Sequence, residues 1–386
     1  MSEKAPIIRN PFFKKAFILL WKIAIGTYII TIPVYSQEHE YSQEREYWQE
    51  RENKIVFWNL ENFFDTFYDE GREDGSFTPF GEMHWTKKRF TAKRNAIAKT
   101  IIGAGEGRAP VIVGFAEVEK RYVLTNLIEE TPLAQIGYSV IHKDSPDRRG
   151  IDVALIYRGE LFSPLETEFI RVILPDTTAT TRDILYTKGV LDREDTLHIF
   201  VNHWPSKFGG AKFSEPGRKA ASDALKRKCD SILHRNESAN IIAMGDFNDI
   251  PDAATITALD NLINLSYSLH KRGEGSIKYR GGWELIDQMM ISRNLLKREA
   301  QESQNQENRQ PESQDEKQHN DTTHLYVESI SVYSPQYLLE KDATYSGMKP
   351  KRTYIGPRYN GGISDHLPTV LEVRSRDKSD KSGSKE

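Results

Sequence analysis

Acidic, amide and imidazole side chains follow a series of short apolar runs, each close to the point where the run ends. The run 241–244, for example, leads through a glycine into Asp246 and Asn248. The candidates of this kind are Asn59, Glu61, Glu117, Glu119, Asn202, His203, Asp246, Asn248, Asp287, Asp365 and His366. Singly, each has a simpler explanation in turn chemistry or as a satisfied polar residue. Together they predict one site, because strand ends that meet at one rim bring distant residues together.

The order of side chains after the run 241–244 predicts which of them face this site. Side chains of a strand alternate between its two faces, so Asp246 and Asn248 point the same way. Phe247 between them is expected to turn inward and anchor the pair. Asp249 then remains as a turn or capping residue.

Oxygen and imidazole groups of this kind indicate hard-cation chemistry. Carboxylate and amide oxygens are preferred ligands of Mg²⁺, Mn²⁺ or Ca²⁺, and the single cysteine, Cys229, excludes a thiolate zinc site and an intrachain disulfide. A cation held by one or two carboxylates keeps positions open for phosphate oxygens and helps to activate water. Histidines beside carboxylates then act as acid/base groups or phosphate donors. The predicted cofactor is therefore Mg²⁺ or Mn²⁺, with Ca²⁺ as an alternative.

Six short motifs carry a resemblance to a known family. In order along the chain they are "FWNLENFFD", "GFAEVE", "NHWPS", "GDFND", "LIDQMMIS" and "SDHLP". The sequence resembles the endonuclease/exonuclease/phosphatase superfamily of metal-dependent phosphoesterases over residues 54–373, and its motifs look like those of a secreted bacterial nuclease-like branch. The resemblance implies the deoxyribonuclease-like fold, an α+β four-layer sandwich of two packed, mostly antiparallel sheets flanked by helices.

The resemblance also implies a metal shell. Glu117 matches the main metal carboxylate of the family, and Asn59 and Asp365 match residues that complete or support the shell. Glu61 and Glu119 are expected only to bond backbone or neighbouring ligands. The resemblance leaves open whether the site binds one metal ion or two.

Carried over in the same way, the catalytic residues are Asp246, Asn248, His366, Asp287 and His203. Asp246 and Asn248 would orient or deprotonate the attacking water and hold the phosphate. His366 would be an acid/base group or a charged phosphate donor, with Asp287 fixing its tautomer. His203 would bond a phosphate oxygen. The division of labour among these residues stays open.

Arg182 and Asn202 are the predicted substrate contacts. Arg182 lies where relatives carry a phosphate-facing arginine, although a surface arginine is an equal alternative. Residues with weaker assignments are Ser206, Lys207 and Arg218, as a substrate wall or a solvated loop, and Asp152, as a site or turn residue. The aromatic residues expected at the rim are Trp58, Phe63, Phe64 and Trp204, for base stacking, membrane contact or, most commonly, core packing.

The elements that must position these residues are mostly strands. Apolar runs predict strands at 55–58, 110–115, 152–157, 197–201, 241–244, 285–291 and 368–373. Helical spacing of apolar residues predicts helices at 86–102 and 217–234. Many strands and few helices favour an α+β sandwich with helices outside. Residues 54–373 are expected to form one domain.

The remaining segments are polar or of the targeting type. Residues 1–36 resemble a signal peptide, with an uncleaved N-terminal anchor as the alternative, and 37–53 is a charged linker. Residues 297–324 and 374–386, rich in polar side chains, are expected to be a disordered insertion and a disordered tail. The protein is thus expected to be exported to the periplasm or secreted.

The leading functional hypothesis is an exported phosphodiesterase that cleaves P–O bonds by in-line attack of water, as a nuclease on DNA or RNA. With 53 Lys and Arg against 56 Asp and Glu, the net charge of −3 gives no overall basic field, so a polyanion requires a local basic patch. The alternatives are a phosphoesterase on a lipid headgroup or small metabolite and, ranked low, a non-catalytic binding protein. We expect a monomer without an obligate protein partner.

Overall fold

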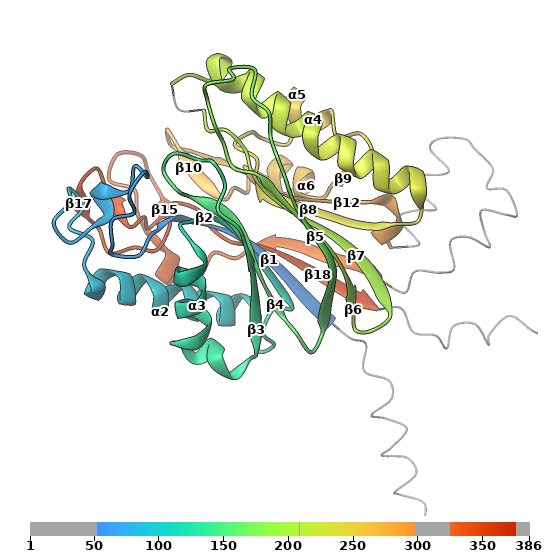
Figure 1. Ribbon diagram of the computed structural model, residues 1–386, viewed down its shortest axis with the longest axis horizontal. Helices are drawn as coiled ribbons and strands as arrows, with labels where there is room; N and C mark the ends of the chain where they lie inside the picture. The colour runs from blue at the N-terminus through green and yellow to red at the C-terminus, as the bar shows by residue number, and fades with distance from the viewer. Residues whose placement is uncertain (1–51, 208, 298–324, 376–386) are drawn as a thin grey trace, which may run out of the picture. The chain divides into compact units, whose positions relative to one another are not determined.

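Two six-stranded sheets organise the fold of this computed structural model (Figure 1). The structure describes residues 52–207, 209–297 and 325–375, which belong to one compact unit, Glu50–Glu386. The predicted signal peptide or anchor, nearly all of the linker, the insertion beyond Lys297 and the tail beyond Ser375 lie outside the described residues.

The first sheet supplies Asn59 and Glu117. Its strands, in spatial order, are β13 (Leu325–Val332), β18 (Thr369–Ser375), β1 (Glu52–Phe63), β2 (Ile112–Val118), β4 (Asp152–Arg158) and β3 (Tyr138–His142). Only β1 and β2 run parallel among its paired strands, and the other pairs are antiparallel.

The second sheet supplies His203, Asp246 and Asp287. Its strands, in spatial order, are β5 (Phe162–Ile170), β6 (Ile184–Leu191), β7 (Asp195–His203), β8 (Asn240–Asp246), β12 (Asp287–Ile291) and β9 (Ile263–Asn264). Here β7 and β8 form the parallel pair, and the other pairs are antiparallel.

Short hairpins and helices complete the described part. The hairpins are β10 (Ile277–Tyr279) with β11 (Gly282–Glu284), β14 (Leu339–Lys341) with β15 (Met348–Pro350), and β16 (Tyr354–Ile355) with β17 (Arg358–Tyr359). The helices are α2 (Lys87–Ala104), α3 (Arg121–Glu129), α4 (Ala211–Arg235), α5 (Ala254–Thr257) and α6 (Ser266–Lys271).

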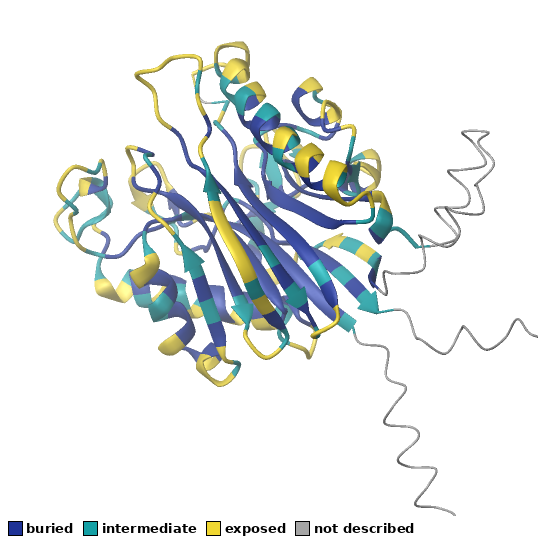
Figure 2. Ribbon diagram, turned by 45° about the vertical axis from the view of Figure 1, so that its right-hand side comes forward, coloured by how far each residue is buried: buried dark blue, intermediate teal, exposed yellow. Residues whose placement is uncertain are grey.

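Three apolar cores make four layers. One core, which includes Ile55, Leu155 and Met244, lies between the sheets. A second packs α2 and α3 against the first sheet, and a third packs α4 against the second sheet. In Figure 2 the strands are mostly buried, while the helices expose their outer faces. Because helices cover the outer faces, central strands such as β8 are buried along their whole length and read as continuous apolar runs.

The predicted fold class is confirmed, and so are the predicted strands and both predicted helices, within a few residues at most ends. Helix α4 is the largest difference, because it begins at Ala211 rather than at residue 217 and contains Pro216. A proline reads as a helix boundary because it lacks a backbone N–H, but the helix continues past it. None of the helices in the described ranges has the length and hydropathy that crossing a membrane requires.

Candidate functional site

Three of the predicted catalytic residues stand in a row across neighbouring strands of the second sheet. Asp246 at the end of β8 is the register partner of His203 in β7 and of Asp287 in β12. Directly opposite residues of paired strands point to the same face. Gly245 makes this close pairing feasible, because a Cβ there would lie 2.5 Å from both the Cβ and the carbonyl oxygen of Asn202.

The first sheet meets this row through Asn59 and Glu117. Asn59 Nδ2 donates a 2.9 Å hydrogen bond to Asp246 Oδ2, which joins the two sheets at this rim. Glu117 Oε1 lies 3.9 Å from His203 Nε2, which is itself 3.7 Å from Asp246 Oδ2. Glu117 Oε2 accepts a hydrogen bond from the backbone of Asn62 at 2.8 Å. The predicted metal carboxylate and the predicted phosphate-binding histidine therefore lie side by side.

Left-handed backbone conformations gather at this rim. Glu61, Asn62, Glu117 and Asn248 have φ angles of 47°, 59°, 60° and 51°. Such conformations are uncommon outside glycine and persist where the surrounding structure enforces them, commonly at functional sites. The local backbone is thus shaped to aim these side chains.

His366 arrives from the loop before β18 and binds Asp287. Its Nδ1 lies 2.6 Å from Asp287 Oδ2. The loop is fixed by Trp58, whose indole N–H donates to the carbonyl of His366 at 2.9 Å, and by Ser364, whose hydroxyl donates to the carbonyl of Asn59 at 2.7 Å. Burial alone would lower the pKa of His366, but the carboxylates around it, Asp287 foremost, hold that pKa well above its usual value. His366 is therefore an imidazolium at neutral pH.

Asp246 is poised for proton transfer. Burial, then the charge of Asp287, raises its pKa to about 7, against the opposing effect of His366 and the hydrogen bond from Asn59. His366 Nε2 lies 3.9 Å from Asp246 Oδ2 and 3.8 Å from Asp365 Oδ1. A carboxyl with a pKa near neutrality suits general acid/base work.

His203 is a neutral imidazole with free hydrogen-bonding capacity. Burial, followed by Arg182, Arg149 and His366, lowers its pKa well below the usual value. Its Nδ1 is buried and has no hydrogen-bond partner within residues 52–207, 209–297 and 325–375, and its Nε2 is beyond hydrogen-bond distance of both Glu117 and Asp246. Buried polar atoms normally have partners. An imidazole in this state is suited to bind a ligand atom.

Two cations balance the acidic residues behind the rim. Arg352 contacts Glu61 Oε1 through Nε at 3.0 Å and Asp365 Oδ2 through Nη2 at 2.9 Å. Lys93 donates to the carbonyl of Glu61 at 2.6 Å, and its burial lowers its pKa to about 8 although Glu61, Glu117 and Asp365 oppose the change. Because Glu117 and Asp365 act on the same two cations, these carboxylates share one neighbourhood.

Asn248 and Arg182 are tied to one carbonyl. Trp204 O accepts Asn248 Nδ2 at 3.0 Å and Arg182 Nη2 at 2.8 Å. Arg182 also donates from Nη1 to Asp147 Oδ2 at 3.1 Å, and it is buried rather than a surface residue. Asn202 is fully buried and bonds Met244 O and the Trp204 indole. Substrate contacts of Arg182 and Asn202 stay predictions, and the contacts shown are internal.

Other candidates have structural partners. Asp249 binds Arg218, Lys207 and Thr255 through its carboxylate oxygens, so this expected turn residue anchors the start of α4 to the segment after β8. Glu119 accepts the backbone N–H of Asp65 at 2.6 Å, and Glu61 binds Arg352, so both make contacts of the kind expected for them. That neither binds a metal stays a prediction.

The aromatic residues expected at the rim are core residues. Trp58, Phe63, Phe64 and Trp204 are each at most 2% exposed. Base stacking or membrane contact by these rings is therefore excluded, and core packing is confirmed. Phe247 is also buried, edge-on to Trp204 with 4.8 Å between ring centroids, so it anchors Asp246 and Asn248 as predicted.

The donor set fits a hard divalent cation. Glu117 and Asp365 offer carboxylate oxygens and Asn59 an amide oxygen, the ligand type that Mg²⁺ and Mn²⁺ take. Asp246, Asp287 and His366 also lie within 4.8 Å of one another through ligand atoms. The 2.6 Å contact between His366 and Asp287 engages both of these residues, however. Glu117, Asn59 and Asp365 therefore stay the predicted ligands of the cation, although Asn59 Oδ1 accepts the backbone N–H of Glu61 at 2.9 Å and Asp365 Oδ2 pairs with Arg352.

Several supporting roles in the site are not evident from the sequence. Trp58 and Ser364, both within the motifs, hold the His366 loop, Lys93 and Arg352 pair with the acidic residues, and Asp147 binds Arg182. Ser364 alone had a usable signal, because a serine directly before Asp365 can bond the backbone two residues on, as it does with His366 N at 3.0 Å.

Comparisons with solved structures give low sequence identity. An endonuclease/exonuclease/phosphatase family protein from Bacteroides thetaiotaomicron is 14% identical, with 85% of this chain and 99% of that chain covered and a TM-score of 0.49. The human Nocturnin catalytic domain with bound sulfate is 16% identical, with 84% and 97% covered and a TM-score of 0.49. D. rerio TDP2 complexed with a single-strand DNA product is 12% identical, with 83% and 98% covered and a TM-score of 0.48.

No curated protein matches the chain in sequence at a significant level. The sequence does match the family described as "Endonuclease/Exonuclease/phosphatase family" over residues 54–310 and 313–375. This match covers most of the 386 residues and every predicted site residue. The chain belongs to the endonuclease/exonuclease/phosphatase family.

Proposed function

We propose that this protein is an exported, divalent-metal-dependent phosphodiesterase that hydrolyses DNA or RNA. The observation that carries the proposal is the convergence of Asp246, His203, Asp287 and His366 on one rim beside Glu117. An acid/base carboxyl, an imidazolium and a neutral imidazole in one place match the needs of phosphate-ester hydrolysis.

The residues have separable tasks in this mechanism. Asp246, oriented by Asn59, accepts the proton of the attacking water. Asn248, whose amide nitrogen is held by Trp204 O, turns its oxygen to that water. His203 donates one N–H to a phosphate oxygen. His366, charged beside Asp287, donates Nε2–H to the reacting phosphate group.

A divalent cation bound by Glu117, Asn59 and Asp365 would neutralise charge on the phosphate and favour in-line attack. Arg352, which contacts Asp365, and Arg149, whose charge reaches His203, are half-exposed. Both arginines already pair with carboxylates, Arg352 with Glu61 and Asp365 and Arg149 with Asp147, so they add no surplus positive charge. The nucleic-acid substrate is therefore proposed from the family resemblance, and the substrate panel below decides it.

Export is proposed from the targeting-type sequence of residues 1–36. Fractionation of the native host would show the mature chain outside the cytoplasm, and cytoplasmic recovery of the unprocessed chain would refute export.

The activity is tested with the purified protein and a substrate panel in Mg²⁺, Mn²⁺ and Ca²⁺. Bis(p-nitrophenyl) phosphate reports phosphodiesterase chemistry, and closed circular plasmid, linear DNA, RNA, sphingomyelin and inositol phosphates report the substrate class. Nicking of the plasmid is the expected result. Turnover of sphingomyelin or an inositol phosphate alone would replace the nuclease proposal, and no turnover of any phosphoester would refute the enzyme.

A further inference from the structure

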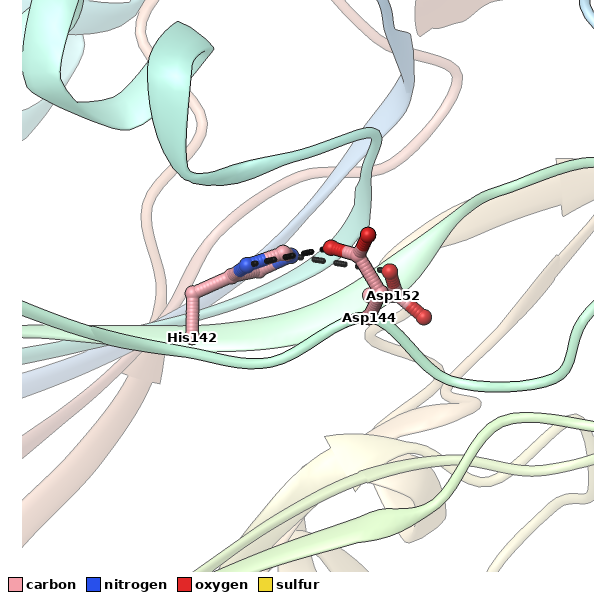
Figure 3. A group of neighbouring side chains, drawn as sticks. All are labelled: His142, Asp144 and Asp152. Carbon is pink, nitrogen blue, oxygen red and sulfur yellow. Dashed lines mark ion pairs between the residues drawn. The ribbon is translucent and has the colours of Figure 1, made fainter. Parts of the chain in front are cut away.

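A second cluster of ligating side chains lies at the end of the first sheet, apart from the residues assigned to catalysis. Figure 3 shows the imidazole of His142 facing the carboxylates of Asp144 and Asp152, which lie together on one side of the ring. His142 ends β3 and pairs with Ala154 of β4, and Asp152 lies two residues before Ala154. Residues two apart in a strand share a face, so His142 and Asp152 are diagonal neighbours.

The facing atoms of His142 and Asp152 are buried and without hydrogen bonds. Their side chains are 2% and 1% exposed, and His142 Nε2 and Asp152 Oδ2 both have no hydrogen-bond partner among the described residues. The second oxygen, Oδ1, accepts the backbone N–H of Ser145 at 2.9 Å, which fixes the carboxylate in this orientation. Two buried, unsatisfied polar atoms aimed at each other are costly unless something binds between them.

The separation of these two atoms fits a shared metal ion. Nε2 and Oδ2 lie 3.5 Å apart, which is long for a hydrogen bond with a usual distance of about 2.9 Å. Two ligands at about 2.1 Å from one ion with tetrahedral geometry lie about 3.4 Å apart. Asp144 Oδ1 lies 3.8 Å from the other ring nitrogen of His142, and ligand atoms of all three residues fall within 4.8 Å of one another. Asp144 is 62% exposed, which leaves an entry from solvent.

We propose that His142, Asp144 and Asp152 bind one Zn²⁺ or Mn²⁺ ion at a site separate from the catalytic cation. An imidazole nitrogen with two carboxylates selects these ions over Mg²⁺ and Ca²⁺, which take oxygen ligands. Asp152 supplies the buried carboxylate, and Asp144 closes the site from the solvent side. The binding does not depend on the proposed phosphodiesterase activity.

Such an ion would fix the loop between β3 and β4, residues 143–151. This loop carries Asp147, which binds Arg182, and Arg182 shares the Trp204 carbonyl with Asn248. Asp152 is also the register partner of Val118, the residue after Glu117. The ion would therefore stabilise the loop that carries Asp147 and the pairing of Asp152 with Val118, and both of these lie next to catalytic residues. It would not contact the substrate.

Calorimetric titration with Zn²⁺ and with Mn²⁺ tests the site in the full chain. Glu117→Gln provides a background in which the catalytic cation site is weakened. On this background we compare His142→Gln with His234→Gln, which alters an exposed histidine near the end of α4. His142→Gln is expected to bind one metal ion fewer, or to bind that ion at least about 10-fold more weakly. His234→Gln is expected to keep the stoichiometry and the affinity of the background. Equal stoichiometry and affinity in the two variants would overturn the proposal.

Asp144→Asn provides a second variant that does not disturb the core, because Asp144 is largely exposed. Binding about 10-fold weaker than in the Glu117→Gln background is expected, together with a smaller Zn²⁺-induced rise in the unfolding temperature. Unchanged affinity in this variant would refute the three-residue site, even if His142→Gln fails to fold.

Discussion

His366 Nδ1 lies 2.6 Å from Asp287 Oδ2, and Asp287 is itself the register partner of Asp246. The loop histidine is therefore fixed on the strand that adjoins the candidate base. Burial is the largest influence on both groups, lowering the pKa of His366 and raising that of Asp246, and the charge of Asp287 raises the pKa of both. The buried carboxylate of Asp287 thus favours the protonated form of both neighbours. In the proposed mechanism His366 then donates a proton, and Asp246, which titrates near neutrality, accepts one.

Asp287→Asn is expected to lower kcat for bis(p-nitrophenyl) phosphate by about 10²- to 10⁴-fold, the range typical of general acid–base groups. The amide cannot stabilise the imidazolium of His366 and favours the wrong tautomer. Steady-state kinetics check the effect, with circular dichroism to confirm the fold. Asp223→Asn, on the half-exposed surface of α4, is the matched control and should keep wild-type rates. A kcat of Asp287→Asn within about twofold of wild type would contradict the role of Asp287.

Glu117→Gln is expected to raise the Mg²⁺ or Mn²⁺ concentration needed for half-maximal activity by about 10- to 100-fold, with activity partly recovered at high metal concentration. The substitution keeps the side-chain shape but removes the charge that would bind the cation. Metal titrations of activity give the answer, and Glu237→Gln at an exposed position is the control. A reduced kcat with unchanged metal dependence would show that Glu117 is not the metal carboxylate.

The strands that carry the site were predictable because helices cover the outer sheet faces, which makes these strands continuous apolar runs. β5 has no such signal, since most of its residues are exposed or half-exposed and its sequence alternates poorly. The ends of β1, β2, β7 and β8 converge because two parallel pairs place them at one rim, and the family motifs mark those ends. The sequence could thus indicate Asn59, Glu117, His203 and Asp246.

The supporting contacts were not predictable, because each joins residues far apart in the chain. Lys93 lies on α2, where a lysine is expected on the solvent-exposed face of the helix. In the structure it is buried against Glu61. Asp147 and Arg182, 35 residues apart, pair through loops with no periodic signal. Arg352 has no motif of its own and is recognisable only from its contact with Asp365.

Arg182→Ala is expected to destabilise the fold by up to about 3–5 kcal/mol, because it removes the buried cation of Asp147 and leaves only the half-exposed Arg149, 3.7 Å away. The side chains of Arg182 and Asp147 are at most 7% exposed, so water cannot replace the lost contact easily. Urea unfolding measures the change, and Arg227→Ala on the exposed face of α4 is the control. If Arg182→Ala keeps wild-type stability and only raises KM, then the internal contacts of Arg182 are dispensable and its role is substrate binding.

The burial of His198 predicts that the stability of the fold depends on pH, independently of the catalytic residues. It is buried in β7, where its Nδ1 lies 2.9 Å from the hydroxyl of Tyr186. Burial, followed by the charges of Lys188, Lys228 and Arg235, lowers its pKa to about 4. An unfolded histidine has a pKa of about 6.5. Between these two values the unfolded chain binds a proton that the folded chain does not, so the folded state loses stability as pH falls through this window.

His198→Gln removes this titration and keeps a hydrogen-bonding group near Tyr186. The wild-type free energy of unfolding, relative to that of the variant, should therefore fall between pH 7 and pH 4.5, by at most about 1.4 kcal/mol per pH unit. Other titrating groups cancel in this difference because both proteins contain them. Urea unfolding at a series of pH values measures it, with the exposed His234→Gln as the control, for which the difference should stay nearly constant. A constant difference for His198→Gln would show that this histidine titrates normally in the folded protein.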